Sequence, residues 1–218
     1  MLSLGENQLQ FVPPELGQLS QLELLDLRGN RLLQLPKELF ANMPKLRQLI
    51  LRQNALEVLP PSIKHLRRLR FLSVRNNVLK VIPAGVSRLT NLRILDANNN
   101  ELETLPDGVS CLVRLNDLHL AFNRLQELPS SLTTLSNLRH LNLCENRLAE
   151  LPSCISTMKS LAFLDLDRNQ LTCLPPWIGM CNNLPSEAHT RSLARVWMGT
   201  FLIVVSCCCC CHCHTQAS

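Results

Sequence analysis

Residues 115–129, which read LNDLHLAFNRLQELP, contain the pattern that decides the fold. The fixed positions are Leu115-x-x-Leu118-x-Leu120-x-x-Asn123-x-Leu125-x-x-Leu128-Pro129. The same frame recurs every 23 or 24 residues, and its asparagines are Asn7, Asn30, Asn54, Asn77, Asn100, Asn123, Asn146 and Asn169. A fixed period in the twenties is typical of a solenoid whose repeats pack against their neighbours. The sequence therefore predicts about eight stacked repeats, which together build a long open surface suited to binding another protein.

Within one repeat, apolar residues alternate until an asparagine turns the chain. We expect Leu138, Leu141 and Leu143 to point into the core, and the spacing of the last two fits a short strand. The amide of Asn146 can then bond backbone groups of the neighbouring coil. Repeated on every coil, this arrangement predicts an asparagine ladder of Asn30, Asn54, Asn77, Asn100, Asn123, Asn146 and Asn169.

The segments opposite the strands carry apolar residues three positions apart, as Leu132 and Leu135 do. Such short segments favour 3₁₀ or loose helical turns, and the preceding Leu-Pro prevents the strand from continuing. One repeat contains an extra residue within 35–44. There we expect a wider turn with Phe40 packed beneath it.

Composition limits the classes of function. Of the 218 residues, 46% are hydrophobic but only 4% are aromatic, which suits a core of stacked leucines. The net charge of +5 is mild and includes no basic run, so we do not expect nucleic-acid binding. Residues 1–10 have no pattern of a secretory signal and no cysteine pair flanks the repeats, so we expect a reducing, cytoplasmic location. No phosphate-binding loop, catalytic triad or zinc-protease motif is present, so we expect neither catalysis nor a cofactor.

The 23-residue frame with its L-P-x-x-I-x-x-L ending resembles the intracellular leucine-rich repeat proteins. That class includes the Ras suppressor, the Shoc-type Ras-binding scaffold and the plant Ras-group proteins, and the resemblance covers residues 1–184. It implies an α/β leucine-rich repeat solenoid, a curved horseshoe with a parallel sheet on its concave face. It also implies a scaffold whose partner is a small GTPase or an effector of one.

Strand positions not occupied by leucine are expected to face the concave groove. Arg28, Arg52 and Arg75 fall two residues before successive ladder asparagines, about 5 Å apart by the strand spacing. We expect these arginines to meet an acidic protein surface, with Phe71 and Ile94 as apolar anchors. Arginine and aromatic residues are frequent hot spots of interfaces.

The alternative for this arginine column is a solvated face in which Arg28 pairs with Asp26. Another column, Arg47, Arg70 and Arg93, precedes the strands, and we interpret it as a set of solubilising residues near the rim.

Two further groups of residues could carry chemistry. His119 and His140 fall diagonally on neighbouring coils, with Asp117 adjacent, but no third ligand or nucleophile is evident. We therefore predict no metal site. Cys111 and Cys154 occupy equivalent convex positions and are interpreted as small packing residues.

The array is predicted to end at Leu184, because Pro185 breaks the strand and Glu187 stands where a core leucine is due. Residues 185–218 then form a non-repeat tail, expected to be disordered or weakly structured. This tail can be interpreted as an unselected alternative product, a membrane anchor or a zinc site. The candidates for lipidation are Cys207, Cys208, Cys209, Cys210 and Cys211.

These observations predict a non-catalytic scaffold or adaptor that binds a partner protein on the concave face, in small-GTPase signalling. Membrane contact is expected only through the tail. The alternatives are a membrane-tethered adaptor and the recognition fragment of a larger enzyme, such as a ubiquitin ligase or a phosphatase.

Overall fold

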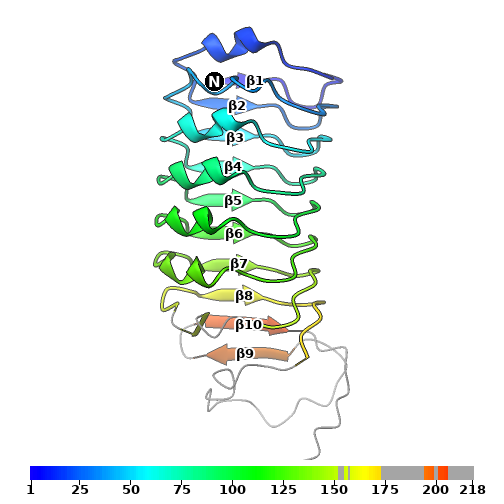
Figure 1. Cartoon of the computed structure of the whole chain (residues 1–218), viewed down its shortest axis with the longest axis vertical. Helices are drawn as coiled ribbons and strands as arrows, with labels where there is room; N and C mark the ends of the chain where they lie inside the picture. Colours follow the sequence, from blue (N-terminus) through cyan, green and yellow to red (C-terminus); the bar gives the residue numbers. More distant parts are fainter. Residues whose placement is uncertain (152–154, 157, 173–193, 199–200, 206–218) are drawn as a thin grey trace, which may run out of the picture.

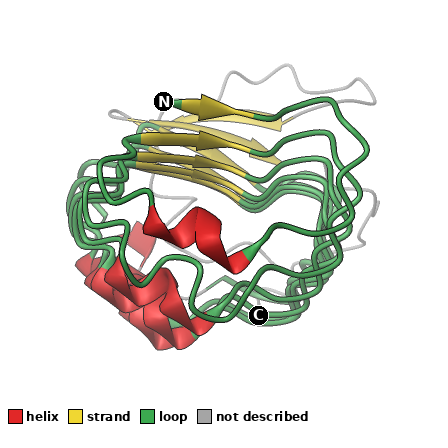
Figure 2. Ribbon diagram, turned by 90° about the horizontal axis from the view of Figure 1, so that it is seen from above, coloured by secondary structure: helices red, strands yellow, loops and turns green. Residues whose placement is uncertain are grey.

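The computed structural model describes residues 1–151, 155–156, 158–172, 194–198 and 201–205, the last two stretches by their backbone alone. The described coils stack along one axis, each with a short strand on one side and a turn on the other (Figures 1 and 2). We call the side that carries the strands the sheet face. The α/β solenoid of about eight repeats is thereby confirmed.

The strands form one sheet in the order β1-β2-β3-β4-β5-β6-β7-β8-β10-β9. Those of the repeats run parallel to one another. Their bounds are β1 (Leu2–Ser3), β2 (Leu24–Asp26), β3 (Gln48–Ile50), β4 (Phe71–Ser73), β5 (Ile94–Asp96), β6 (Asp117–His119), β7 (His140–Asn142) and β8 (Phe163–Asp165).

The register of the sheet places one leucine of every repeat in the core. From β2 to β8 the central residue is a fully buried leucine: Leu25, Leu49, Leu72, Leu95, Leu118, Leu141 and Leu164. Because side chains alternate along a strand, the residues on either side of this leucine point to the sheet face. They form two rows that run across the coils, as the sequence predicts. The first row is Leu24, Gln48, Phe71, Ile94, Asp117, His140 and Phe163, and the second is Asp26, Ile50, Ser73, Asp96, His119, Asn142 and Asp165.

Opposite the sheet, the predicted helical turns are 3₁₀ helices. They are η1 (Pro14–Gln18), η2 (Pro61–His65), η3 (Ala84–Arg88), η4 (Asp107–Cys111) and η5 (Ser130–Thr134). Each follows a proline in extended conformation, and the carbonyl of that proline accepts the first bond, as Pro129 does from the Leu132 N–H at 3.1 Å. The Leu-Pro pair therefore ends one segment and opens the next.

The coil with the extra residue replaces the 3₁₀ helix with a run of turns over residues 37–42. Phe40 is fully buried beneath it, as the sequence predicts. Its backbone N–H donates to the Ser62 hydroxyl at 3.2 Å, which ties the turn to the next coil.

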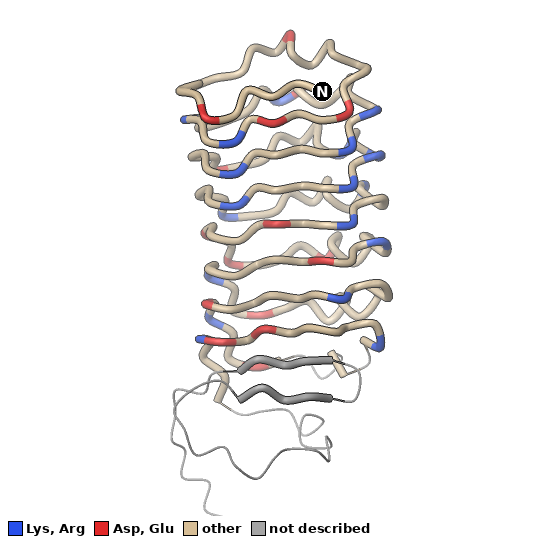
Figure 3. Tube along the Cα trace, turned by 180° about the vertical axis from the view of Figure 1, so that it is seen from behind, with Lys and Arg blue, Asp and Glu red and all other residues tan. Residues whose placement is uncertain are grey.

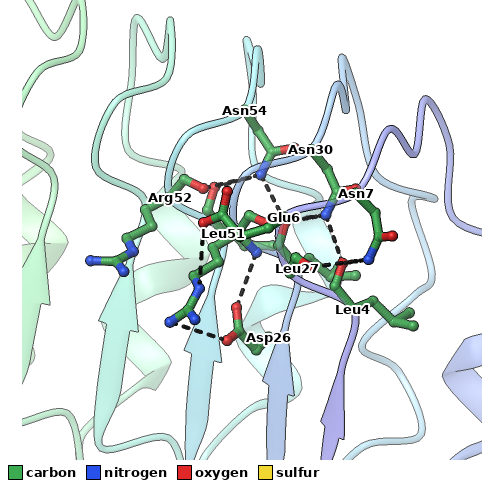
Figure 4. Close-up of polar contacts among 11 residues, drawn as sticks. Leu4, Glu6, Asn7, Asp26, Leu27, Asn30, Leu51, Arg52 and Asn54 are labelled. Carbon is green, nitrogen blue, oxygen red and sulfur yellow. Dashed lines mark hydrogen bonds and ion pairs between the residues drawn. The ribbon is translucent and has the colours of Figure 1, made fainter.

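The predicted asparagine ladder is present (Figure 4). The Asn30 Nδ2 donates to the carbonyl of Leu27 in its own coil at 3.0 Å and to that of Leu4 in the preceding coil at 2.9 Å. Its Oδ1 accepts the N–H of Leu9, also in the preceding coil, at 3.0 Å. One side chain thus satisfies backbone groups of two coils.

The residue before each ladder asparagine has a positive φ, which the sequence pattern does not reveal. In the second coil it is Gly29, with φ of 60°. Elsewhere it is Glu6, Gln53, Asn76, Asn99, Phe122, Glu145 or Arg168, with φ between 53° and 56°. Non-glycine residues rarely adopt this conformation, so the ladder must hold the bend in place.

Beyond the last repeat, β10 (Phe201–Val205) pairs in parallel with β8, and β9 (Ala194–Met198) pairs antiparallel with β10. Leu202 lies opposite Phe163 in this register. These strands fall within the segment predicted to be a weakly structured tail. The boundary at residue 184 and the cysteine run 207–211 lie outside the described residues, so the division into array and tail remains a prediction.

Candidate protein-binding groove

A shallow groove of about 570 Å³ crosses the sheet face of the N-terminal coils. Leu24, Phe71 and Ile94 form its apolar floor, each half-buried in the first row of the sheet face. Gln48 interrupts the floor between Leu24 and Phe71. The two apolar anchors predicted from the sequence, Phe71 and Ile94, therefore lie side by side on adjacent strands.

One wall of the groove is basic. Arg47, Arg70 and Arg93 each lie near the start of a strand, are exposed, and line the same groove as the apolar floor. The Arg47 Nη2 lies 3.8 Å from the Glu23 Oε1. Within the described residues, Arg70 and Arg93 have no carboxylate partner. From the sequence we interpreted these three arginines as solubilising rim residues, and this interpretation missed that they line the groove. The available signal was that Arg70 directly precedes Phe71 and that Arg93 directly precedes Ile94.

The predicted binding column, Arg28, Arg52 and Arg75, lies beyond the opposite ends of the strands, so the strands separate it from this wall. Figure 3 shows basic residues along both edges of the sheet face in these coils. Arg28 lies 3.7 Å from each of two carboxylates, those of Glu6 and Asp26, which is the local pairing considered as an alternative. In the described part of the chain, neither Arg52 nor Arg75 forms an ion pair. The structure thus brings the anchors together with another arginine row, and a binding role for Arg28, Arg52 and Arg75 remains a prediction.

The sheet face of the later coils is mixed to acidic, as the sequence predicts, with Asp165 and Asp167 beside Arg168. Burial raises the pKa of Asp165 and outweighs the lowering by the hydrogen bond from the Asp167 N–H, and the charge of Asp167 adds to the rise. The pKa of the Cys144 thiol is raised to about 11, first by burial and then by the charge of Asp165. This thiol is therefore protonated at neutral pH and is a poor nucleophile. Arg168, at the edge of this acidic region, pairs with Glu145.

The two histidines do not build a metal centre. The His140 Nδ1 contacts the Asp117 carboxylate, and His119 lies diagonally on the neighbouring strand, as predicted. The described residues contain no cluster of three or more His, Cys, Asp and Glu side chains placed to hold a metal ion.

The two cysteines that were interpreted as packing residues have different outcomes. Cys111 is exposed at the end of η4, so its interpretation as a packing residue was wrong. Cys154 lies outside the described residues.

In the part of the chain that the structure describes, no helix has the length and the apolar character to span a bilayer.

A family model described as leucine rich repeat matches residues 20–79, 67–125 and 113–171. A leucine-rich repeat protein of Leptospira interrogans is 35% identical, with a TM-score of 0.64; the match covers 82% of this chain and 51% of that one. An internalin of Listeria monocytogenes is 23% identical, with a TM-score of 0.69. The match covers 77% of this chain and 47% of the internalin, and at this identity it supports a shared fold and nothing further.

Plant receptors are also similar. The ectodomain of the receptor kinase GASSHO1/SCHENGEN3 of Arabidopsis thaliana, solved with CASPARIAN STRIP INTEGRITY FACTOR 2, is 26% identical with a TM-score of 0.67. The match covers 94% of this chain and 26% of the receptor. The chain therefore spans about half of the Leptospira protein (51%) and about a quarter of the Arabidopsis ectodomain (26%).

Proposed function

Because this chain belongs to the leucine-rich repeat family, whose fold generally mediates protein–protein interaction, we propose that it is a non-catalytic scaffold that binds a partner protein on its sheet face. The observation that carries the proposal is the groove on that face, where Arg47, Arg70 and Arg93 border an apolar floor. Arginine beside an apolar or aromatic anchor is the composition from which interface hot spots are built.

The charge of the groove favours an acidic partner. Arg70 and Arg93 have no carboxylate partner among the described residues, and stacked coils bring their backbones to about 4.8 Å from one another. Like charges on neighbouring coils repel, and a partner's carboxylates would relieve the repulsion. The column Arg28, Arg52 and Arg75 extends the basic surface to the far ends of the strands.

We place this binding in small-GTPase signalling in the cytoplasm, on the strength of the resemblance of the 23-residue frame to the Ras-associated class. A similar plant peptide hormone receptor, RGFR1 solved in complex with RGF2, and the GASSHO1/SCHENGEN3 ectodomain support the coarser idea that such an array binds a polypeptide. A tether through the cysteines of residues 207–211 remains the alternative arrangement.

Affinity capture tests this function with two triple charge reversals. One variant is Arg47→Glu/Arg70→Glu/Arg93→Glu and the other is Arg28→Glu/Arg52→Glu/Arg75→Glu. The matched control, Lys64→Glu/Arg67→Glu/Arg88→Glu, changes the net charge equally on exposed residues in and beside η2 and η3, away from the strands.

Each protein is incubated with cell extract loaded with GTP analogue or with GDP, and bound proteins are identified by mass spectrometry. We expect a partner that the control retains and that at least one sheet-face variant loses. Enrichment of that partner in the GTP-analogue arm would support the GTPase assignment. An identical set of partners for all variants would overturn binding on the sheet face.

A further inference from the structure

We infer that the groove receives an acidic polypeptide segment in the polyproline II conformation, carrying one apolar and one acidic residue in each three-residue turn. This inference rests on the proposed protein-binding function and names the kind of ligand that the same site accepts. The observation behind it is the arrangement of two rows of side chains in the groove, the apolar floor and the arginine wall.

The two rows lie next to each other and run in the same direction. Arg70 directly precedes Phe71 and Arg93 directly precedes Ile94, so each of these two coils offers a cation and an apolar group on adjacent positions of the groove. A ligand that satisfies both rows needs an apolar side and a neighbouring acidic side. A β-strand presents side chains on two opposite sides, so it cannot direct one set to the floor and the other to the adjoining wall. A polyproline II helix has three sides about 120° apart, because it has three residues per turn, and two of these sides are neighbours.

The repeat distances also match. A polyproline II helix advances about 9.3 Å per turn. Two coils of the array advance about 9.6 Å, twice the spacing of neighbouring strands. On the floor, Leu24 and Phe71 are two coils apart with Gln48 between them. On the wall, Arg47 and Arg93 are two coils apart in the same way.

A segment that lies along the array can therefore place apolar residues i and i+3 over Leu24 and Phe71. Its acidic residues i+1 and i+4 then fall beside Arg47 and Arg93. Arg70 lies between these two arginines and can contact either carboxylate. A polyproline II backbone leaves its N–H and C=O groups solvated, so the ligand needs no free sheet edge, and the described sheet is paired along this stretch.

The inference is tested with labelled peptides and the full chain, by fluorescence anisotropy. The probe is a peptide of repeated Pro-Leu-Glu triplets, in which leucine and glutamate fall on separate sides of the helix. A scrambled peptide of the same composition spreads both residues over all three sides, and a Pro-Leu-Lys peptide reverses the charge. Arg70→Glu/Arg93→Glu, the wall variant, reverses two of the three wall arginines, Phe71→Ala reduces the floor, and Arg67→Glu/Arg88→Glu is the charge-matched control.

We expect the triplet peptide to bind the wild type and the control equally, and the wall variant at least about tenfold more weakly. The scrambled and lysine peptides should also bind the wild type at least about tenfold more weakly, and Phe71→Ala should weaken triplet binding about fivefold. Equal binding of the triplet and scrambled peptides would overturn the three-sided fit. Unchanged affinity in the wall variant would overturn the assignment to this groove.

The two proposals can fail separately. If the triplet peptide does not bind while Arg47→Glu/Arg70→Glu/Arg93→Glu still loses a captured partner, the ligand conformation is wrong and the protein-binding function stands. If neither the peptide nor any captured partner responds to charge reversal, both proposals are wrong.

Discussion

At the scale of single residues, each buried ladder asparagine holds backbone groups of two neighbouring coils, as Asn123 does. The Asn123 Nδ2 donates to the carbonyls of Leu120 at 2.9 Å and Ala97 at 3.0 Å, and its Oδ1 accepts the Leu102 N–H at 3.0 Å. Asn123 itself is only 7% exposed, so water cannot readily replace these bonds.

Asn123→Ala should therefore lower the free energy of unfolding by about 1–3 kcal/mol, the usual cost of unsatisfied buried polar groups. Urea denaturation measures the change. The control is Asn137→Ala, which removes one exposed hydrogen bond, from Asn137 Nδ2 to the Val113 carbonyl at 2.7 Å. A loss in Asn123→Ala no larger than in Asn137→Ala would mean that water satisfies the freed groups.

Asp165 shows the opposite case, a polar residue whose charge opposes folding. Its Oδ1 accepts the Asp167 N–H at 3.1 Å, and on the preceding coil the Asn142 Oδ1 accepts the Cys144 N–H at 3.0 Å. An asparagine can therefore make this bond without a charge. Because burial raises the pKa of Asp165, the folded state holds the proton more tightly than the unfolded state does. Stability of the wild type from this group rises as the pH falls through the raised pKa.

Asp165→Asn should consequently be more stable than the wild type at neutral pH. The gain should shrink as the pH falls through the raised pKa and vanish below the ordinary carboxyl pKa of about 3.9, where Asp165 is protonated in both the folded and the unfolded state. Urea denaturation at several pH values measures the difference between variant and wild type. The reciprocal change, Asn142→Asp, puts a second carboxylate opposite Asp165 and should be destabilising at neutral pH. A gain in Asp165→Asn that persists unchanged at low pH would contradict the electrostatic cause.

At the scale of the elements, the coil with the extra residue constrains its neighbour. Gly17, in η1, is buried, and a Cβ built there would lie 2.7 Å from the backbone oxygen of Leu39. The wider turn of residues 37–42 thus leaves room only for glycine. At Gly85, in η3, the nearest atom would be the Lys64 Cβ at 3.3 Å, so the neighbouring coil would have to shift only by a few tenths of an ångström.

Gly17→Ala should therefore destabilise the array by about 1–3 kcal/mol, as overpacking does, while Gly85→Ala should have a smaller effect. Thermal or urea unfolding of the two variants gives the comparison. A loss in Gly17→Ala as small as the one expected for Gly85→Ala would mean that the backbone near Leu39 shifts at little cost.

The repeat frame predicts the elements well because each of its positions has one physical role. A leucine at the centre of a strand and a proline before a 3₁₀ turn serve the same purpose in most of the described coils, so periodicity reveals both. The left-handed residue before the ladder was missed because its identity varies: Gln53, Phe122 and Arg168 share the conformation but not the chemistry. The backbone bonds of the ladder impose the bend, so glycine is not required at this position. No recurring residue type therefore marks the bend in the sequence.

The groove was only partly predictable for a related reason. Register alone gives the rows on the sheet face, and it correctly places Phe71 beside Ile94. Which arginines wall the hollow depends on the volumes and directions of neighbouring side chains, and these do not follow from spacing. The sequence therefore favoured Arg28, Arg52 and Arg75 over Arg47, Arg70 and Arg93.

At the scale of the whole molecule, the array is a row of coils whose contacts are nearly all between neighbours. The described sheet continues from β8 to β10, so the segment after the repeats covers an edge that would otherwise expose unpaired backbone groups. In a solenoid, a change at one end acts chiefly on the adjacent coil. The end of the array should thus depend on β10, and the groove should not.

Deleting residues 186–218 removes β9 and β10 and turns β8 into an edge strand. We expect faster hydrogen exchange at Phe163–Asp165 and unchanged exchange in β3, β4 and β5, with circular dichroism nearly the same as for the full chain. Deleting only 206–218 keeps both strands and serves as the control, with no change expected in β8. Unchanged protection of β8 in the longer deletion would show that β10 contributes nothing to the end of the array. Loss of protection throughout the coils would show instead that stability depends on the C-terminal end as a whole, because local fraying leaves distant coils intact.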